Sequence, residues 1–294
     1  MVNAMTMIVS EFDDVTLHSL TYGAEDGPLA LCLHGFPDTA HTFRHLGPHL
    51  AQRGYRVVAP FMRGYAPSTV SLSHNYQVAA LAHDAVQLHE SLGGDERAVL
   101  IGHDWGAVAA YPAAAAQPSR WRRVVTLAMP PLATFAQAFT DFDQLRASWY
   151  MFYFQNPLAE TVVRHNGLEF LSRLWAEWSP GYDAGVDLGL VREALVHQEN
   201  LRAALNYYRA MFDGMETIDP ETAEFAAAMF HAPPVPVLYL QGENDGCIRV
   251  ERLGSPLDHL APGSKFEVVP GVGHFLHLEK PAVIHEAIDR FLEV

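Results

Sequence analysis

Three side chains that together could perform nucleophilic catalysis follow predicted strands in chain order. The first, Asp104, is the central residue of a Gly-His-Asp-Trp-Gly motif (102–106) between a buried strand pattern and an alanine-rich helix pattern. Small residues at both ends of the motif let strand and helix meet at a sharp turn, which lifts the central side chain above the edge of a sheet. A carboxylate there could attack an electrophilic carbon and form an ester. It could also simply cap the helix, which is a common role for aspartate.

An acid and a histidine later in the chain complete the set. Asp245 lies in a loop after the apolar segment 231–242, and His274 lies in the loop after the strand pattern 264–270. Nucleophile, acid and histidine in this order are typical of one catalytic architecture, in which all three follow the carboxyl ends of parallel strands. His103 is a competing histidine, but as the neighbour of Asp104 it should point away from it. We therefore expect Asp245 to orient His274 as a general base.

A fourth element could stabilise negative charge. The segment His-Gly-Phe-Pro (34–37) follows the first buried strand pattern and could be no more than a turn before a helix. In the same architecture this loop supplies one backbone N–H of an oxyanion hole, here that of Phe36. The second donor would be the N–H of Trp105, the residue after the nucleophile.

The elements around these residues alternate between strand and helix patterns. Such alternation predicts a mostly parallel, doubly wound sheet with helices on both faces. Residues 15–22 alternate apolar and polar, as in a half-solvated antiparallel strand. Further strands are expected at 29–35, 56–60, 98–102, 121–128, 231–242 and 264–270, and helices at 43–53, 75–94, 105–117, near 251–260 and near 281–293.

One segment departs from this alternation. Residues 132–226 lose the short apolar strands and become helical, with a dense group of aromatic side chains. We find no internal repeat. The sequence therefore predicts a core domain formed by 1–131 and 227–294, with a helical insertion at 132–226 lying over it.

Composition excludes several classes of protein. With 49% hydrophobic and 18% charged residues among 294, the chain is too apolar for a disordered protein. Its net charge of −15 makes nucleic acid and anionic membrane surfaces poor partners. No apolar run reaches the roughly 18 residues of a membrane span. Cys32 and Cys247 are far apart in sequence, and no Cys/His spacing resembles a zinc site.

The first ten residues carry neither a basic segment nor a long apolar one, so we expect no signal peptide. The expected location is the cytoplasm.

Motifs along the whole chain resemble those of the soluble epoxide hydrolases of the α/β-hydrolase fold. HGFPDT, RGYAPS, GHDWGA, the GEND loop and GVGHF occur in that family's order. The resemblance implies an eight-stranded sheet with a helical cap, and a small apolar epoxide as substrate. It also implies no cofactor and no metal, and a monomer or a homodimer.

The resemblance extends to the insertion. WYMFYFQNP (149–157) looks like the family's cap motif, which assigns a ring-opening acid to Tyr153, and LNYYRAM (205–211) assigns the second to Tyr208. Tyr150 and Tyr207 are adjacent alternatives that spacing alone leaves open, and packing explains most other aromatics. The implied substrate contacts are His34, Pro37, Trp149, Tyr150, Phe154 and Gln155.

In the implied mechanism, the carboxylate of Asp104 opens the epoxide to form an ester, and water activated by His274 hydrolyses it. The alternatives are a haloalkane or haloacetate dehalogenase with the same triad, and a non-catalytic protein that binds a small ligand. Haloalkane dehalogenases have Asn or Glu where this chain has Phe36, and haloacetate dehalogenases have Arg where it has Trp105. An esterase would require serine in place of Asp104.

Overall fold

A sheet of eight strands organises the computed structural model, which describes residues 5–212 and 219–293. Residues 1–4, 213–218 and 294, which belong to the predicted core and cap ranges, lie outside the described residues. The strand order is β1-β2-β4-β3-β5-β6-β7-β8. The strands are β1 (Thr6–Glu11), β2 (Thr16–Tyr22), β3 (Leu29–Leu33), β4 (Arg56–Pro60), β5 (Val99–His103), β6 (Arg123–Leu127), β7 (Val237–Gly242) and β8 (Lys265–Val269).

Strand pairing divides the sheet into an antiparallel edge and a parallel remainder. β1 pairs with β2, and β2 with β4, in antiparallel fashion, whereas every other neighbouring pair is parallel. The central strands β3, β5 and β7 are buried along their whole length, as their apolar runs require when helices cover both faces. The predicted mostly parallel, doubly wound sheet is confirmed.

The edge strand β1 was not predicted from the sequence. Four of its six residues are exposed and only Ser10 is buried, so the strand has no apolar face that a periodicity could reveal. Its register comes from the ladder that it forms with β2.

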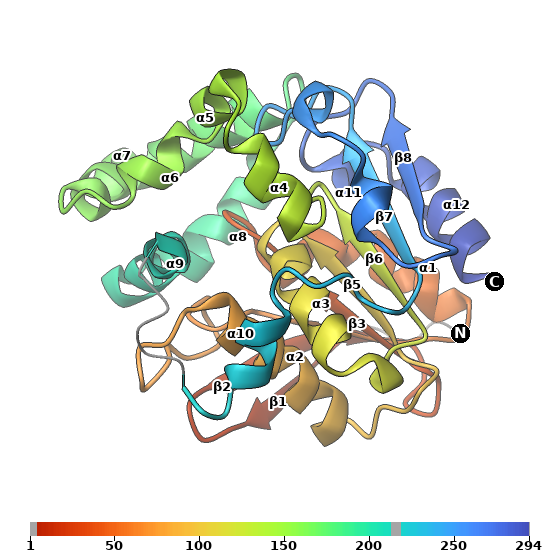
Figure 1. Ribbon diagram of the computed structural model, residues 1–294. Helices are drawn as coiled ribbons and strands as arrows, with labels where there is room; N and C mark the ends of the chain where they lie inside the picture. Colours follow the sequence, from red (N-terminus) through yellow and green to blue (C-terminus); the bar gives the residue numbers. More distant parts are fainter. Residues whose placement is uncertain (1–4, 213–218, 294) are drawn as a thin grey trace.

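Helices cover both faces of the sheet. Figure 1 shows α2, α3 and α10 in front of it and α1 and α12 behind, and α10 packs on both α2 and α3. A helix predicted near 251–260 is wrong: only two short 3₁₀ turns occur there, Val250–Arg252 and Pro256–His259. The helices that flank the sheet are α1 (Leu46–Gln52), α2 (Val78–Ser91), α3 (Trp105–Ala116), α10 (Ala223–Ala228), α11 (Leu276–Glu279) and α12 (Pro281–Leu292).

The remaining helices come from the insertion between β6 and β7. Figure 1 shows them, in green to teal, gathered on one side of the sheet. None of the described helices combines the length and the apolar character needed to span a bilayer. The helices of the insertion are α4 (Leu132–Ala138), α5 (Phe142–Ala147), α6 (Trp149–Tyr153), α7 (Ala159–Trp178), α8 (Gly185–Leu195) and α9 (Gln198–Phe212).

Candidate active site

A strained turn between β5 and α3 presents Asp104. Its backbone has φ 50° and ψ −117°, a left-handed φ that few non-glycine residues adopt. The turn needs small neighbours: a Cβ on Gly106 would lie 2.0 Å from the carbonyl oxygen of Leu33, and one on Gly102 would lie 2.4 Å from the backbone of Gly106. The carboxylate makes no hydrogen bond to the N-terminus of α3, so the helix-capping interpretation is wrong.

His274 lies between two carboxylates. Its Nδ1 is 2.9 Å from Oδ2 of Asp245, and its Nε2 is 3.5 Å from Oδ2 of Asp104. Asp245 is held in turn by the backbone N–H of Cys247 at 2.7 Å and the side-chain amide of Gln241 at 2.8 Å. The three predicted triad residues are therefore brought together by loops at the carboxyl ends of β5, β7 and β8.

The loop after β3 supplies a hydrogen-bond donor to Asp104. The backbone N–H of Phe36 donates to Oδ1 of Asp104 at 2.8 Å. This close approach requires glycine at position 35, because a Cβ there would lie 2.4 Å from the side chain of Asp104. Trp105, the other predicted donor, begins α3, and its buried ring packs against that of Tyr208 at 5.0 Å.

Two buried tyrosines from the insertion lie near the nucleophile. The rings of Tyr150 (α6) and Tyr208 (α9) are 5.6 Å apart. Burial raises the pKa of both phenols, and the negative charge of Asp104 contributes to both increases. The hydroxyl of Tyr208 has no hydrogen-bond partner among the described residues, whereas that of Tyr150 lies 3.3 Å from Sγ of Cys247. Two phenolic proton donors thus lie near Asp104.

The other two candidate tyrosines lie elsewhere. Tyr153 is partly exposed, and its ring packs against Phe170 and Trp149. Tyr207 uses its hydroxyl to donate to the carbonyl oxygen of Arg63 at 2.8 Å. The structure therefore groups Tyr208 with Tyr150, the alternative that the sequence left open, and leaves the assigned Tyr153 outside this group.

Residues 28–281 match the sequence model of the α/β-hydrolase fold. The chain belongs to this family. It is 30% identical to an epoxide hydrolase of Caballeronia sordidicola, over 99% of this chain and 96% of that one. It is 28% identical to epoxide hydrolase A of Mycobacterium tuberculosis, with 98% of each chain covered. A solved structure of a Klebsiella pneumoniae protein superposes with a TM-score of 0.84 at 26% identity, covering 98% of this chain and 97% of the other. The predicted resemblance to epoxide hydrolases is confirmed, and the chain is a hydrolase.

The six predicted substrate contacts of this α/β-hydrolase fall into three kinds. Tyr150 and Phe154 face the site, and the ring of Phe154 contacts those of Phe36 and Tyr208. Trp149 is 43% exposed on the outside of the insertion.

The other three hold backbone segments in place. His34 accepts a hydrogen bond from the N–H of Met62 at 3.0 Å, which links the loop after β3 to the loop after β4. The carbonyl oxygen of Pro37 accepts one from the indole of Trp175 at 2.8 Å. The amide of Gln155 donates to the carbonyl oxygen of Tyr208 at 2.9 Å and so joins α6 to α9.

Two residues at the site were not singled out from the sequence. The carbonyl oxygen of Trp178, at the end of α7, accepts hydrogen bonds from the N–H groups of His274 and Gly246. Sγ of Cys247 lies within 4.8 Å of the ligand atoms of both Asp104 and His274, a group that could hold a metal ion. Burial raises the pKa of the Cys247 thiol, which keeps it protonated. Its place two residues after Asp245 was the only sequence signal for it.

The site of this hydrolase holds its charges in a fixed pattern. Burial alone would raise the pKa of Asp104, but His274, whose Nε2 lies 3.5 Å away, and the N–H of Phe36 hold it below its usual value. Burial likewise opposes a charge on His274, yet Asp245 and Asp104 together raise its pKa to about 10. The resting site therefore contains an imidazolium between two carboxylates. Because an imidazolium cannot accept a proton, His274 could act as a base only after one of the two negative charges is lost.

Replacing Asp104 by asparagine removes one of these charges with little change in shape. We expect the pKa of His274 to fall, because a carboxylate that favours the imidazolium is gone. NMR titration of the imidazole would measure it, and His89, whose lowered pKa comes from burial and has no contribution from Asp104, serves as a control. An unchanged pKa for His274 would mean that Asp245 alone sets it.

In the unaltered chain, the protonation of His274 also stabilises the folded state. This contribution to the free energy of unfolding is fully present below the ordinary pKa of 6.5 and is lost as the pH rises through about 10.

Proposed function

We propose that the chain hydrolyses epoxides to vicinal diols through an ester formed on Asp104. One observation carries the proposal: a carboxylate nucleophile lies near two buried phenols, those of Tyr150 and Tyr208. An epoxide has no good leaving group, so opening it at neutral pH needs a nucleophile on carbon and an acid on oxygen together. The epoxide hydrolases among the relatives add support.

In the first step, Oδ2 of Asp104 attacks a ring carbon. Oδ1 is already engaged by the N–H of Phe36, which leaves Oδ2 free to react. The carbon–oxygen bond of the ring breaks, and the departing oxygen takes a proton from Tyr150 or Tyr208. The products are a hydroxyalkyl ester of Asp104 and a tyrosinate.

In the second step, loss of charge on Asp104 activates His274. The ester no longer favours the imidazolium, so its proton can pass to the tyrosinate, and neutral His274 then accepts a proton from water. The resulting hydroxide attacks the ester carbonyl, and the oxyanion that forms at Oδ1 is stabilised by the N–H of Phe36. Collapse of this intermediate releases the diol. The diol leaves as an alkoxide. It takes the proton of the newly formed carboxylic acid of Asp104, and this restores the carboxylate.

An apolar cavity leads us to propose that the substrate carries an apolar substituent. It encloses about 380 Å³ between α2, α3, α4, α9 and α10. Val108 on its wall lies one helical turn after Asp104, and Met211 lies one turn after Tyr208. We propose that the insertion acts as a cap domain over the core, with the substrate bound between them.

Tyr150→Phe and Tyr153→Phe form a matched pair that tests the acid assignment. Removing one positioned acid costs roughly 10²–10⁴-fold in rate. We therefore expect Tyr150→Phe to slow alkylation by at least 10²-fold and Tyr153→Phe to leave it within a factor of a few. Tyr208→Phe should resemble Tyr150→Phe, and the double variant should not show the product of the two losses, because the phenols share one oxygen. Stopped-flow measurement of ester formation separates this step from hydrolysis. The reverse order of effects in the matched pair would return the role to Tyr153.

A turnover assay with styrene oxide and 1-bromobutane tests the function itself. We expect styrene diol from the epoxide and no bromide release. Bromide release without diol would indicate a dehalogenase, and binding of either compound without turnover would indicate a ligand-binding protein.

A further inference from the structure

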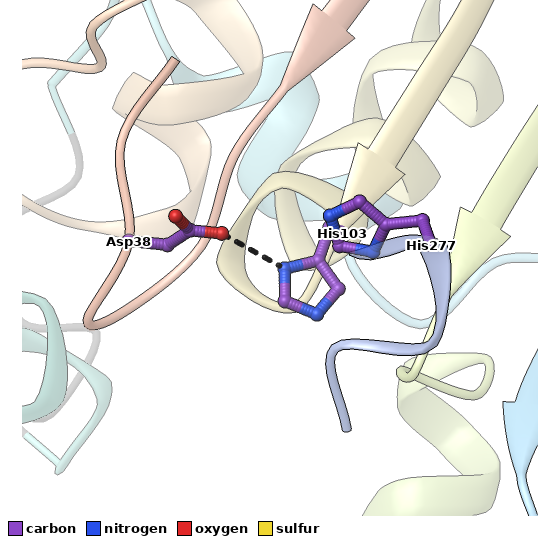
Figure 2. A group of neighbouring side chains, drawn as sticks. All are labelled: Asp38, His103 and His277. Carbon is purple, nitrogen blue, oxygen red and sulfur yellow. Dashed lines mark ion pairs between the residues drawn. The ribbon is translucent and has the colours of Figure 1, made fainter. Parts of the chain in front are cut away.

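A second group of buried polar side chains lies beside His274. Asp38 follows β3, His103 ends β5, and His277 belongs to α11. Each is at most 2% exposed. Figure 2 shows the three side chains together, and their potential ligand atoms all lie within 4.8 Å of one another.

One polar atom of each residue in this group has no hydrogen-bond partner among the described residues. Oδ2 of Asp38, Nδ1 of His103 and Nδ1 of His277 are all unpaired among the described residues. The distance from Oδ2 of Asp38 to Nδ1 of His103 is 3.8 Å, too long for a hydrogen bond. Since buried polar atoms are nearly always paired, the two that face each other, Oδ2 of Asp38 and Nδ1 of His103, indicate a missing common partner.

The opposite ring nitrogens indicate what kind of partner this is. Nε2 of His103 lies 3.1 Å from the carbonyl oxygen of His274, which can only accept, so Nε2 carries the hydrogen and Nδ1 a lone pair. Nε2 of His277 lies 2.5 Å from the hydroxyl of Thr42. Either group can be the donor in this contact. A lone pair on Nδ1 of His103 and an oxygen of Asp38 thus face each other beside the ring of His277.

The pKa values at this place show which groups are charged. Burial lowers the pKa of His103 to about 3 and that of His277 well below its usual value, so both rings are neutral. Burial raises the pKa of Asp38 to about 8, so at neutral pH this carboxyl carries a proton that a bound cation would displace.

We propose that Asp38, His103 and His277 bind a divalent cation of the Zn²⁺ type in a structural role. Two imidazole nitrogens and one carboxylate oxygen form a common zinc ligand set. The contact of the outer ring nitrogen of His103 with a carbonyl oxygen is the support that zinc-binding histidines usually have. Bonds of about 2.0–2.2 Å place ligand atoms about 3.4 Å apart, whereas the atoms of this group lie within 4.8 Å of one another, so the three segments must move together by up to about 1.4 Å. The ion would join the loops that carry Phe36, Asp104 and His274.

Titration with Zn²⁺ after removal of bound metal by a chelator tests the proposal. We expect calorimetry to give one zinc per chain, and the melting temperature to rise by about 5 °C at a hundredfold excess over Kd. His277→Gln and Asp38→Asn should each weaken binding by at least 100-fold. Cys247→Ala is the matched control, because Asp104, Cys247 and His274 form the other candidate group. Its affinity for zinc should equal that of the unaltered chain.

Cobalt provides a readout of the ligands. Co²⁺ in the proposed site should give d–d absorption without the intense charge-transfer band of a thiolate ligand. Absence of zinc binding, or binding that is lost in Cys247→Ala and retained in His277→Gln, would overturn the proposal. In the first case a buried water or a proton would pair with the three atoms, and in the second the ion would bind at the catalytic group. Circular dichroism of both ligand variants identifies any that fail to fold, and Asp38→Asn decides the outcome if His277→Gln is unfolded.

Discussion

Asp104→Ala will fold normally and will not open epoxides at a measurable rate. The carboxylate is the attacking group in the proposed first step, and losses of roughly 10⁴–10⁶-fold are typical when a nucleophile is removed. The fold should tolerate the change, because the carboxylate accepts one hydrogen bond, from Phe36, and caps no helix. Diol formation measured by chromatography, with circular dichroism as the folding control, would test this expectation.

An isotope experiment on the unaltered chain shows where water attacks. In a single turnover in ¹⁸O water, the label should enter the side chain of Asp104, because hydroxide adds to its carbonyl carbon and the diol takes the old Oδ2. Mass spectrometry of the peptide that contains Asp104 detects the label. In a second turnover, labelled oxygen should appear in the diol. Label in the diol after the first turnover, with none in the protein, would mean that water attacks the epoxide directly.

His274→Gln will separate the two half-reactions. Ring opening needs Asp104 and the phenols, whereas ester hydrolysis needs the base. Loss of a general base costs roughly 10²–10⁴-fold, so the ester should form and then persist. Intact-protein mass spectrometry should show an increase equal to the mass of the epoxide.

The double variant Asp104→Ala/His274→Gln is the matched control for this result. It should show no mass increase, which would place the ester on Asp104 and on no other nucleophile. If His274→Gln binds the epoxide normally and accumulates no ester, the imidazolium would be needed for ring opening. The role assigned to this histidine would then be wrong.

The triad could be predicted from the sequence because parallel strands end at one edge of a sheet. Asp104, Asp245 and His274 each follow a short apolar run, so chain order alone was enough to bring them together. The choice between Tyr150 and Tyr153 could not be made in the same way. Both belong to the short helix α6, and only the surroundings of that helix, with Cys247 on one side and Phe170 on the other, separate them.

The cluster of Asp38, His103 and His277 could not be recognised from spacing. Its members come from three separate segments, the loop after β3, the end of β5 and α11, so no local Cys/His pattern marks them. Two further elements had no local signal either. β1 is exposed along most of its length, and the region 251–260 forms only 3₁₀ turns although its residue pattern suggests a helix.

The carbonyl contact of Trp178 and the indole contact of Trp175 have a consequence for protein engineering. Both tryptophans belong to α7. The carbonyl oxygen of Trp178 accepts from the N–H of His274, and the indole of Trp175 donates to the carbonyl oxygen of Pro37, so each holds the backbone of one of these loops. Exchanging the insertion for that of a relative would therefore also displace His274 and the loop that carries the N–H of Phe36. Selectivity and turnover in this chain are properties of one shared set of contacts, and transplanting the insertion as a separate module would alter both.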